Sequence, residues 1–348
     1  MAEVTAPIVR SPRGSRSARL TGYLGAAVVA VMFLACLATL PYTLGRVPAA
    51  VTAVDEGQLG TLPRRFEATS LDQALLPPFW AHHAPDERAR LDAAAEPATR
   101  RPRHFFGTDR LGRDLFVRCL AGGGISLSIG LAAALVAVFI GTAYGTVSGY
   151  MGGRVDAAMM RIVDILYGLP NVLLVVLLAV AVDGIIERAG ADIAPGVRQI
   201  INVLTLLIAI GGVTWLTMAR VIRGQVLSLK QQPFIEACRA TGVPLRRQFF
   251  VHLLPNLLGP IIVYATLTVP AAILSESFLS FLGIGVKEPL PSWGNLAAAG
   301  LNELNIVRSR WWLLLWPCLF IAIALLALNF VGEALREALD PKRRPARG

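Results

Sequence analysis

Charged side chains are scarce in this sequence, and their scarcity excludes an ordinary soluble domain. Asp, Glu, Lys and Arg make up 16% of the 348 residues, whereas hydrophobic residues make up 55%. A soluble domain usually has about 25% charged residues. Several apolar runs are about 20 residues long, which is the length that a helix needs to cross a bilayer. Composition therefore assigns the chain to the membrane proteins.

Cysteines are few and nucleotide-binding motifs are missing. The four cysteines are far apart and show no spacing typical of disulfides or metal sites: Cys36, Cys119, Cys238 and Cys318. Small apolar filling is the simplest role for them. Neither GxxxxGKS nor GxxxxGKT occurs, so the chain has no ATP site of that kind. No nucleophile–base pair or metal cluster is apparent either. We therefore expect no catalytic residues, no metal, no cofactor in this chain and no enzyme activity from it alone.

The sequence does contain six apolar runs, each long enough to cross about 30 Å of hydrocarbon at 1.5 Å per residue. The runs are 21–44, 125–150, 159–182, 200–222, 257–274 and 311–331. Because lipid offers no hydrogen-bond partners, they should be helices, and the fold should be all-α and polytopic. In the first run, Cys36 follows Leu34 and Ala35 as in a lipoprotein signal. The run continues to Leu44, which favours an uncleaved span.

Basic residues indicate the orientation of these spans. The net charge is +10, and arginines and lysines gather beside apolar runs. Such an excess can indicate nucleic-acid binding, but this placement is typical of orientation signals. We predict cytoplasmic tails at 1–20 and 336–348 and a cytoplasmic loop between the fourth and fifth spans. The loop 45–122 is then extracytoplasmic, with short helices such as 85–95 and no core of its own, and 123–335 form a core with five spans.

The loop 234–255 between the fourth and fifth spans is basic and patterned. One helical face is small-residued in its middle: Phe234, Ala237, Cys238 and Thr241. Gly242 permits a turn, and Pro244 can begin a second helical piece. That piece has its own apolar stripe: Leu245, Phe249 and Leu253. The pattern favours a docking element for a cytoplasmic protein, and the alternative is an amphipathic loop lying on lipid headgroups.

Five sequence blocks occur in an order that resembles one transporter family. They are TDRLGRD (108–114), GYMGG with Asp156, EAC (236–238) with Gly242 and Leu254-Pro255, SFLSFLG with SWG (277–294), and LR with LDP (335–341). Together they resemble ABC importer permeases of the dipeptide/oligopeptide/nickel family, C-type subunit. The third block resembles the EAA motif with Cys238 in place of the second alanine, and HLLPN (252–256) resembles the peptide-importing branch. The similarity covers about 105–342 and the first span. Residues 46–104 exceed the loop usual there, so no role is carried over to them.

This resemblance implies a type I ABC importer permease fold with six transmembrane helices in a bacterial cytoplasmic membrane. It also implies an ATPase-coupling role for Glu236, Ala237, Cys238, Gly242, Arg246, Leu254 and Pro255. ATP and Mg would be held by partner ATPase subunits. The implied partners are a homologous B-type permease, two ATP-binding subunits, an extracytoplasmic solute-binding protein and membrane lipid, with no nucleic acid. The implied cargo is a di- or oligopeptide, with nickel or another small solute as the alternative.

Two further groups of residues are candidates for roles within the membrane. Glu276, Ser277, Phe278 and Phe281, near the outer end of the fifth span, are candidates for the translocation path or an outer gate. Glu276 could line the outer mouth or sit at the membrane interface. Gly141, Gly145 and Gly149 recur every four residues, which permits close helix packing, either within the chain or at a moving interface with a second permease. Asp164 and Arg161, three residues apart, form a candidate ion pair.

An alternative from a different class of protein is a secondary transporter or channel that works alone. Such proteins typically show inverted internal repeats or several buried charges, and neither is evident in the sequence. The patterned basic loop would also have no purpose in such a protein.

Overall fold

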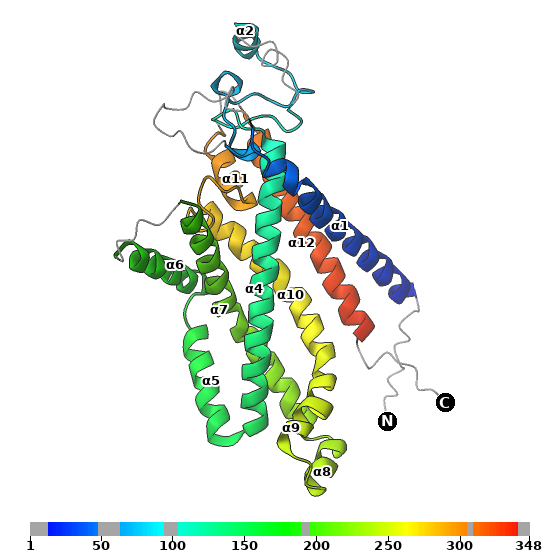
Figure 1. The fold of residues 1–348 in the computed structure, drawn as a ribbon. Coiled ribbons are helices and arrows are strands. Elements are labelled where there is room, and N and C mark those ends of the chain that lie inside the picture. Colours follow the sequence, from blue (N-terminus) through cyan, green and yellow to red (C-terminus); the bar gives the residue numbers. More distant parts are fainter. Residues whose placement is uncertain (1–12, 48–62, 94–103, 189–194, 305–308, 340–348) are drawn as a thin grey trace, which may run out of the picture.

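The computed structural model describes residues 13–47, 63–93, 104–188, 195–304 and 309–339. Within these residues every regular element is a helix, and β-pairing is limited to isolated bridges (Figure 1). The two predicted tails lie largely outside the described residues, and so do two parts of the predicted outer loop. An all-helical membrane fold, as predicted, is what the described residues form.

Seven long helices form the bundle in the described part of the chain. They are α1 (Arg13–Thr43), α4 (Leu115–Met151), α5 (Gly153–Tyr167), α6 (Asn171–Arg188), α7 (Pro195–Lys230), α10 (Leu254–Phe281) and α12 (Trp312–Leu339). The smaller elements are η2 (Arg65–Glu67), η3 (Leu71–Gln73), α2 (Pro85–Ala93), α8 (Pro233–Ala240), α9 (Leu245–Arg247), the π-helical η4 (Gln248–Leu253) and α11 (Trp293–Leu301). Five stretches are long and apolar enough to cross a membrane: Leu20–Thr43, Leu115–Met151, Gly196–Lys230, Leu245–Phe281 and Trp312–Leu339.

The third predicted span, 159–182, is not one continuous helix, and that prediction is wrong. Helices α5 and α6 meet at 87°. The break contains Gly168 and Pro170. Proline has no amide hydrogen and disfavours helical geometry in the residue before it. The described residues therefore hold five spans, or six if this bent pair is counted as one broken span.

Helices α4 and α7 are longer than the spans predicted for them. They contain 37 and 36 residues, which corresponds to about 55 Å each. Helix α4 begins ten residues before the predicted position because Asp114 caps it, with its carboxylate accepting from the amides of Phe116 and Val117 at 2.8 and 3.2 Å. Because the hydrocarbon core is only about 30 Å thick, both helices extend beyond it.

Small residues bring α4 and α7 close together. A Cβ on Gly145 would lie 2.3 Å from the carbonyl oxygen of Ala219, and one on Gly141 would lie 2.5 Å from the Cβ of Met218. Gly149 faces Val226 in the same way. The structure thus places the three predicted packing glycines inside this chain, against α7, and all three are buried.

The described parts of the predicted outer loop lie over one end of the bundle, at the top of Figure 1. Phe66 packs with Val117 and Ala121 of α4. Phe106 stacks on Trp316 of α12, with ring centroids 3.9 Å apart. Phe66 and Phe106 of this loop therefore pack directly against helices of the bundle. Helices α8 and α9 lie at the opposite end (Figure 1).

Candidate functional site

The turn after α8 depends on one glycine. Gly242 has φ of +70°, the left-handed conformation that favours glycine. The amides of Thr241, Gly242 and Val243 donate to the carbonyls of Ala237, Arg239 and Cys238 at 3.0–3.1 Å. These bonds close the end of α8, while Pro233 occupies its first turn. The predicted turn is present at the predicted residue.

Helix α8 presents a largely exposed surface. Phe234, Glu236, Ala237 and Thr241 are exposed and Cys238 is half-buried. The predicted small-residued face is therefore accessible. Ile235 is fully buried and anchors the helix to the bundle. Ile235 was not among the predicted residues. An isoleucine within a basic loop is nevertheless a signal for an inward-facing position.

The second half of the loop differs from the prediction. We expected a second short helical piece within 234–255, whereas the helix that begins at Leu245 runs unbroken to Phe281. Pro255 falls in the first turn of α10, where its missing amide hydrogen is tolerated. Of the predicted apolar stripe, Leu253 is buried, Phe249 is half-buried and Leu245 is 64% exposed. The loop is thus a direct extension of α10.

Polar contacts tie this loop to the ends of α4 and α7. The hydroxyl of Tyr150 donates to Oε1 of Gln248 at 2.9 Å, and Nε2 of Gln248 donates to the carbonyl of Val243 at 2.7 Å. Lys230 Nζ donates to the carbonyls of Gly149 and Tyr150 at 3.1 and 2.7 Å. The Tyr150–Gln248 bond fixes the loop to α4, and the Lys230 bonds fix the end of α7 to the end of α4. Periodicity alone could not reveal these long-range contacts.

Helix α5 is attached to α7 by two ion pairs. Asp156 accepts from Nε and Nη2 of Arg223 at 2.5 Å each. Asp164 accepts from Arg220 at 2.8 Å, and the Arg220 guanidinium also lies 4.0 Å from the centre of the Tyr167 ring. The expected partner of Asp164 was Arg161, and that expectation is wrong. Arg220 reaches Asp164 because α7 runs beside α5.

The four residues predicted near an outer gate separate into two environments. Glu276 is fully buried, and the hydroxyls of Ser280 and Ser277 donate to it at 2.8 and 3.3 Å. In this conformation Glu276 therefore lies neither at a mouth nor at an exposed interface, and Ser277 is buried beside it.

Phe278 and Phe281 retain accessible surface. Phe278 is 44% exposed and Phe281 is half-buried. Phe278 lines a groove of about 380 Å³ between α6, α7 and α10, together with Val172 and Thr214. Of the four predicted residues, only these two phenylalanines could touch a solute or a neighbouring chain here.

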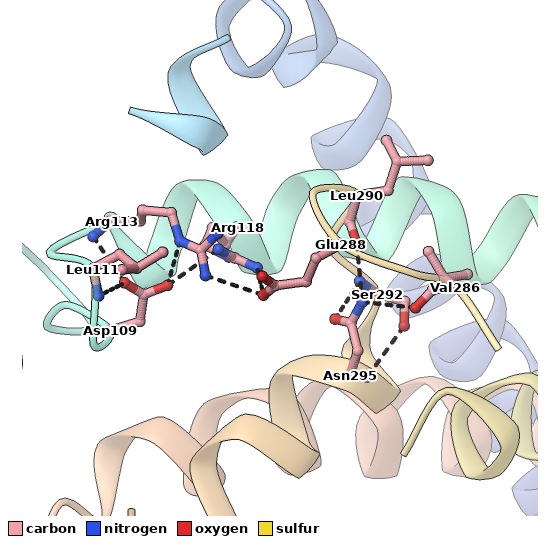
Figure 2. A network of polar contacts seen from close by, with 9 residues as sticks. All are labelled: Asp109, Leu111, Arg113, Arg118, Val286, Glu288, Leu290, Ser292 and Asn295. Carbon is pink, nitrogen blue, oxygen red and sulfur yellow. Dashed lines mark hydrogen bonds and ion pairs between the residues drawn. The ribbon is translucent and has the colours of Figure 1, made fainter. Parts of the chain in front are cut away.

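A largely buried ionic network lies under the predicted outer loop, in a part of the bundle called the outer corner below (Figure 2). Asp109 Oδ2 accepts from Nε of Arg113 at 2.7 Å and from Nη1 of Arg118 at 3.1 Å. Both arginines also donate to Oε1 of Glu288, at 3.1 and 3.3 Å. The network joins the 108–114 block to the loop before α11. Arg118 and Glu288 were missed in the sequence because Arg118 lies after TDRLGRD and Glu288 lies in the gap between SFLSFLG and SWG.

Asn295 completes this corner from α11. Its Nδ2 donates to the carbonyls of Val286 and Leu290 at 3.2 and 2.9 Å. Ser292 and Asn295 also exchange hydrogen bonds, with the Ser292 amide donating to Asn295 Oδ1 at 2.9 Å (Figure 2). The segment before α11 is therefore held at both ends by side chains of this chain.

The described residues contain no group of three or more His, Cys, Asp or Glu side chains that could hold a metal ion. Polar contacts position helices both at the α8–α9 loop and at the outer corner. The α8–α9 loop is exposed and lies at one end of the long bundle. These features define a multi-pass membrane protein with an exposed loop at one end of its bundle. The comparisons identify the family within that class.

The chain belongs to the family described as "Binding-protein-dependent transport system inner membrane component", whose model matches residues 141–345, more than half of the chain. It is 49% identical over 241 residues to the oligopeptide transport system permease protein OppC of Escherichia coli K12, covering 69% of this chain and 73% of the relative. The OppC of Haemophilus influenzae is 46% identical, with 69% and 71% covered. The dipeptide transport system permease protein DppC of Bacillus subtilis is 43% identical over 271 residues, with 78% of each covered.

Proposed function

We propose that this chain is the C-type permease subunit of an ATP-driven importer of di- or oligopeptides in a bacterial cytoplasmic membrane. The observation that carries the proposal is the exposed α8 turn, which projects beyond the bundle between two membrane-spanning helices. An exposed apolar patch away from lipid is typical of a protein interface. Phe234, Leu245, Phe250 and Val251 supply that patch, with 39–64% of each side chain exposed.

The contacts of the loop support a coupling role. Ile235 anchors α8, Gln248 binds Tyr150 of α4, and Lys230 of α7 binds the end of α4. The second half of the loop is continuous with α10. A displacement of α8 would therefore move α4, α7 and α10 together, which is a rigid-body route to alternating access. In this proposal the residues in contact with the ATPase are Glu236, Ala237, Cys238, Gly242 and Arg246, while Leu254 and Pro255 join the loop to α10.

Energy must then come from partner subunits. The sequence has no P-loop, so ATP and Mg would bind to two ATPase subunits. The chain has one docking loop, whereas an ATPase dimer presents two equivalent grooves, so a second, homologous permease would supply the other. An extracytoplasmic binding protein would deliver the solute. The relatives are named for oligopeptide and dipeptide transport, which favours a peptide over nickel as cargo.

The experiment that tests the assembly is native mass spectrometry of the purified transporter, combined with peptide uptake into vesicles. We expect one copy of this chain per complex, with one different permease and two ATPase subunits. We also expect this chain alone to hydrolyse no ATP and to move no peptide. An uptake-competent complex that holds two copies of this chain and no second permease would disprove the heteromeric proposal.

A second prediction concerns orientation. Positively charged loops stay in the cytoplasm, so a cysteine at position 246 should be shielded from a membrane-impermeant thiol reagent added to intact cells. A cysteine at position 72, in the segment at the other end of the bundle, should be labelled. Both are placed in a variant without the four native cysteines. We also expect Glu187 to be outside, although its side chain is not among those described. Labelling at 246 but not at 72 would invert the topology.

A further inference from the structure

An apolar groove with a volume of about 310 Å³ lies between α1, α4 and the start of α7. Its α1 wall consists of one side of the last three turns: Phe33, Leu37, Leu40 and Leu44. Ser128 of α4 lines it and is exposed. Phe66 closes it near the end of the bundle that carries residues 63–93. The groove belongs to neither the docking loop nor the outer corner.

The dimensions of the groove match one leaflet of a bilayer. From Phe33 to Leu44 the helix rises about 16 Å, roughly half of a 30 Å hydrocarbon core. The groove is therefore long enough for much of one lipid acyl chain.

Three arginines gather where the groove ends. An antiparallel bridge pairs Arg46 with Arg64, and the amide of Arg65 donates to the carbonyl of Gly45 at 2.9 Å. These contacts bring the backbone of the three arginines next to Leu44 and Phe66, which line the groove, and the Arg64 guanidinium lies 6.0 Å from the centre of the Phe66 ring. In the part of the chain that the structure describes, none of the three takes part in an ion pair.

The nearest polar groups leave these arginines available. The guanidinium of Arg65 lies 3.9 Å from the centre of the Tyr42 ring, and its buried Nε has no hydrogen-bond partner among the described residues. Glu67 is the closest acid in sequence, and its carboxylate accepts from the backbone amide of Arg64 at 3.1 Å. Tyrosine beside the end of an apolar span, as here at Tyr42, is typical of a membrane interface.

We infer that this groove is a binding site for an anionic phospholipid. One acyl chain lies along α1 and α4, and the lipid phosphate is held by Arg46, Arg64 and Arg65. Guanidinium groups bind phosphate oxygens in a bidentate manner and are weakly hydrated, so they suit a site at headgroup level. In the proposed orientation this lipid lies in the outer leaflet. The leaflet depends on the proposed function, whereas the site itself does not.

The test measures lipid bound to the intact transporter. The complex is placed in phosphatidylcholine nanodiscs with increasing fractions of phosphatidylglycerol, and the lipid retained after extraction is counted by native mass spectrometry. We expect the wild type to retain phosphatidylglycerol in preference to phosphatidylcholine. The double variant Arg46→Gln/Arg64→Gln should need about tenfold more phosphatidylglycerol for equal retention. The control variant Arg88→Gln/Arg90→Gln removes two exposed arginines of α2 and should behave as the wild type.

The groove itself is tested independently of the arginines. Ser128→Phe fills it from an exposed position and should abolish retention, whereas Leu131→Phe, exposed on α4 outside the groove, should not. A photo-crosslinker at position 128 should capture lipid in native membranes. Capture of a second permease at that position, equal retention of both lipids, or retention that neither the arginine nor the Ser128 variant lowers would overturn the proposal.

Discussion

Replacing Gly242 by proline is expected to abolish peptide uptake while the chain still reaches the membrane. Gly242 has φ of +70°, whereas the proline ring holds φ near −65°. The turn after α8 would have to rebuild, and α8 would lose its direction relative to α10. Alanine can reach the left-handed conformation at a cost of about 1–2 kcal/mol, so Gly242→Ala should retain part of the uptake. ATP-driven uptake by vesicles that contain equal amounts of each variant is the measurement.

Matched controls separate the turn from general damage. Gly259 lies within α10 with open space around its Cβ position and no positive φ, so Gly259→Ala should leave uptake unchanged. Glu236→Lys reverses an exposed acid of α8 and should uncouple uptake from ATP hydrolysis, whereas Glu333→Lys, exposed near the end of α12, should not. If Gly242→Pro, at normal abundance, transported peptide and stimulated ATP hydrolysis like the wild type, the docking role would be refuted.

Local sequence features were sufficient to predict the docking loop's turn. Gly242 followed by Pro244 indicates a turn because each residue has a strong backbone preference of its own. The same reasoning could have found the bend between α5 and α6, since Gly168 and Pro170 stand together in that run. The length of the apolar run concealed it, because hydropathy registers the amount of apolar surface and not the continuity of the helix.

Contacts between distant segments could not be predicted from the sequence. Ile235 and Leu245 are both apolar residues of the docking loop, yet the first is buried and the second exposed. Which of them faces the bundle depends on how α7 and α10 are placed, and no local period encodes that placement. Glu276 was similarly ambiguous. Its burial depends on a neighbouring element: Gly294 of α11 packs against Ser277, the next residue, and this contact forms only in the folded chain.

The outer corner shows the same dependence and supplies a sharp stability test. Asp109→Asn keeps an oxygen for the amides of Leu111 and Arg113 but removes the negative charge from a site where the Arg118 side chain is 1% exposed. Removing one partner of a buried ion pair typically costs about 3–5 kcal/mol, and here the buried Arg118 would keep only the exposed Glu288 as its acidic partner. We therefore expect Asp109→Asn to lower the free energy of unfolding of the detergent-purified transporter by about that amount.

Glu288→Gln is the matched comparison, because Glu288 meets the same two arginines but its side chain is 57% exposed. An exposed partner of this kind contributes about 0–1 kcal/mol, so this variant should unfold close to the wild type. The double variant Asp109→Asn/Arg118→Met should recover part of the stability lost in Asp109→Asn, since it keeps the oxygen for the two amides and removes the Arg118 charge as well. Thermal unfolding followed by the monodisperse fraction on size exclusion ranks the three variants. If Glu288→Gln proved as destabilising as Asp109→Asn, or if the double variant were worse than either, the network would not be held by the buried Asp109–Arg118 pair.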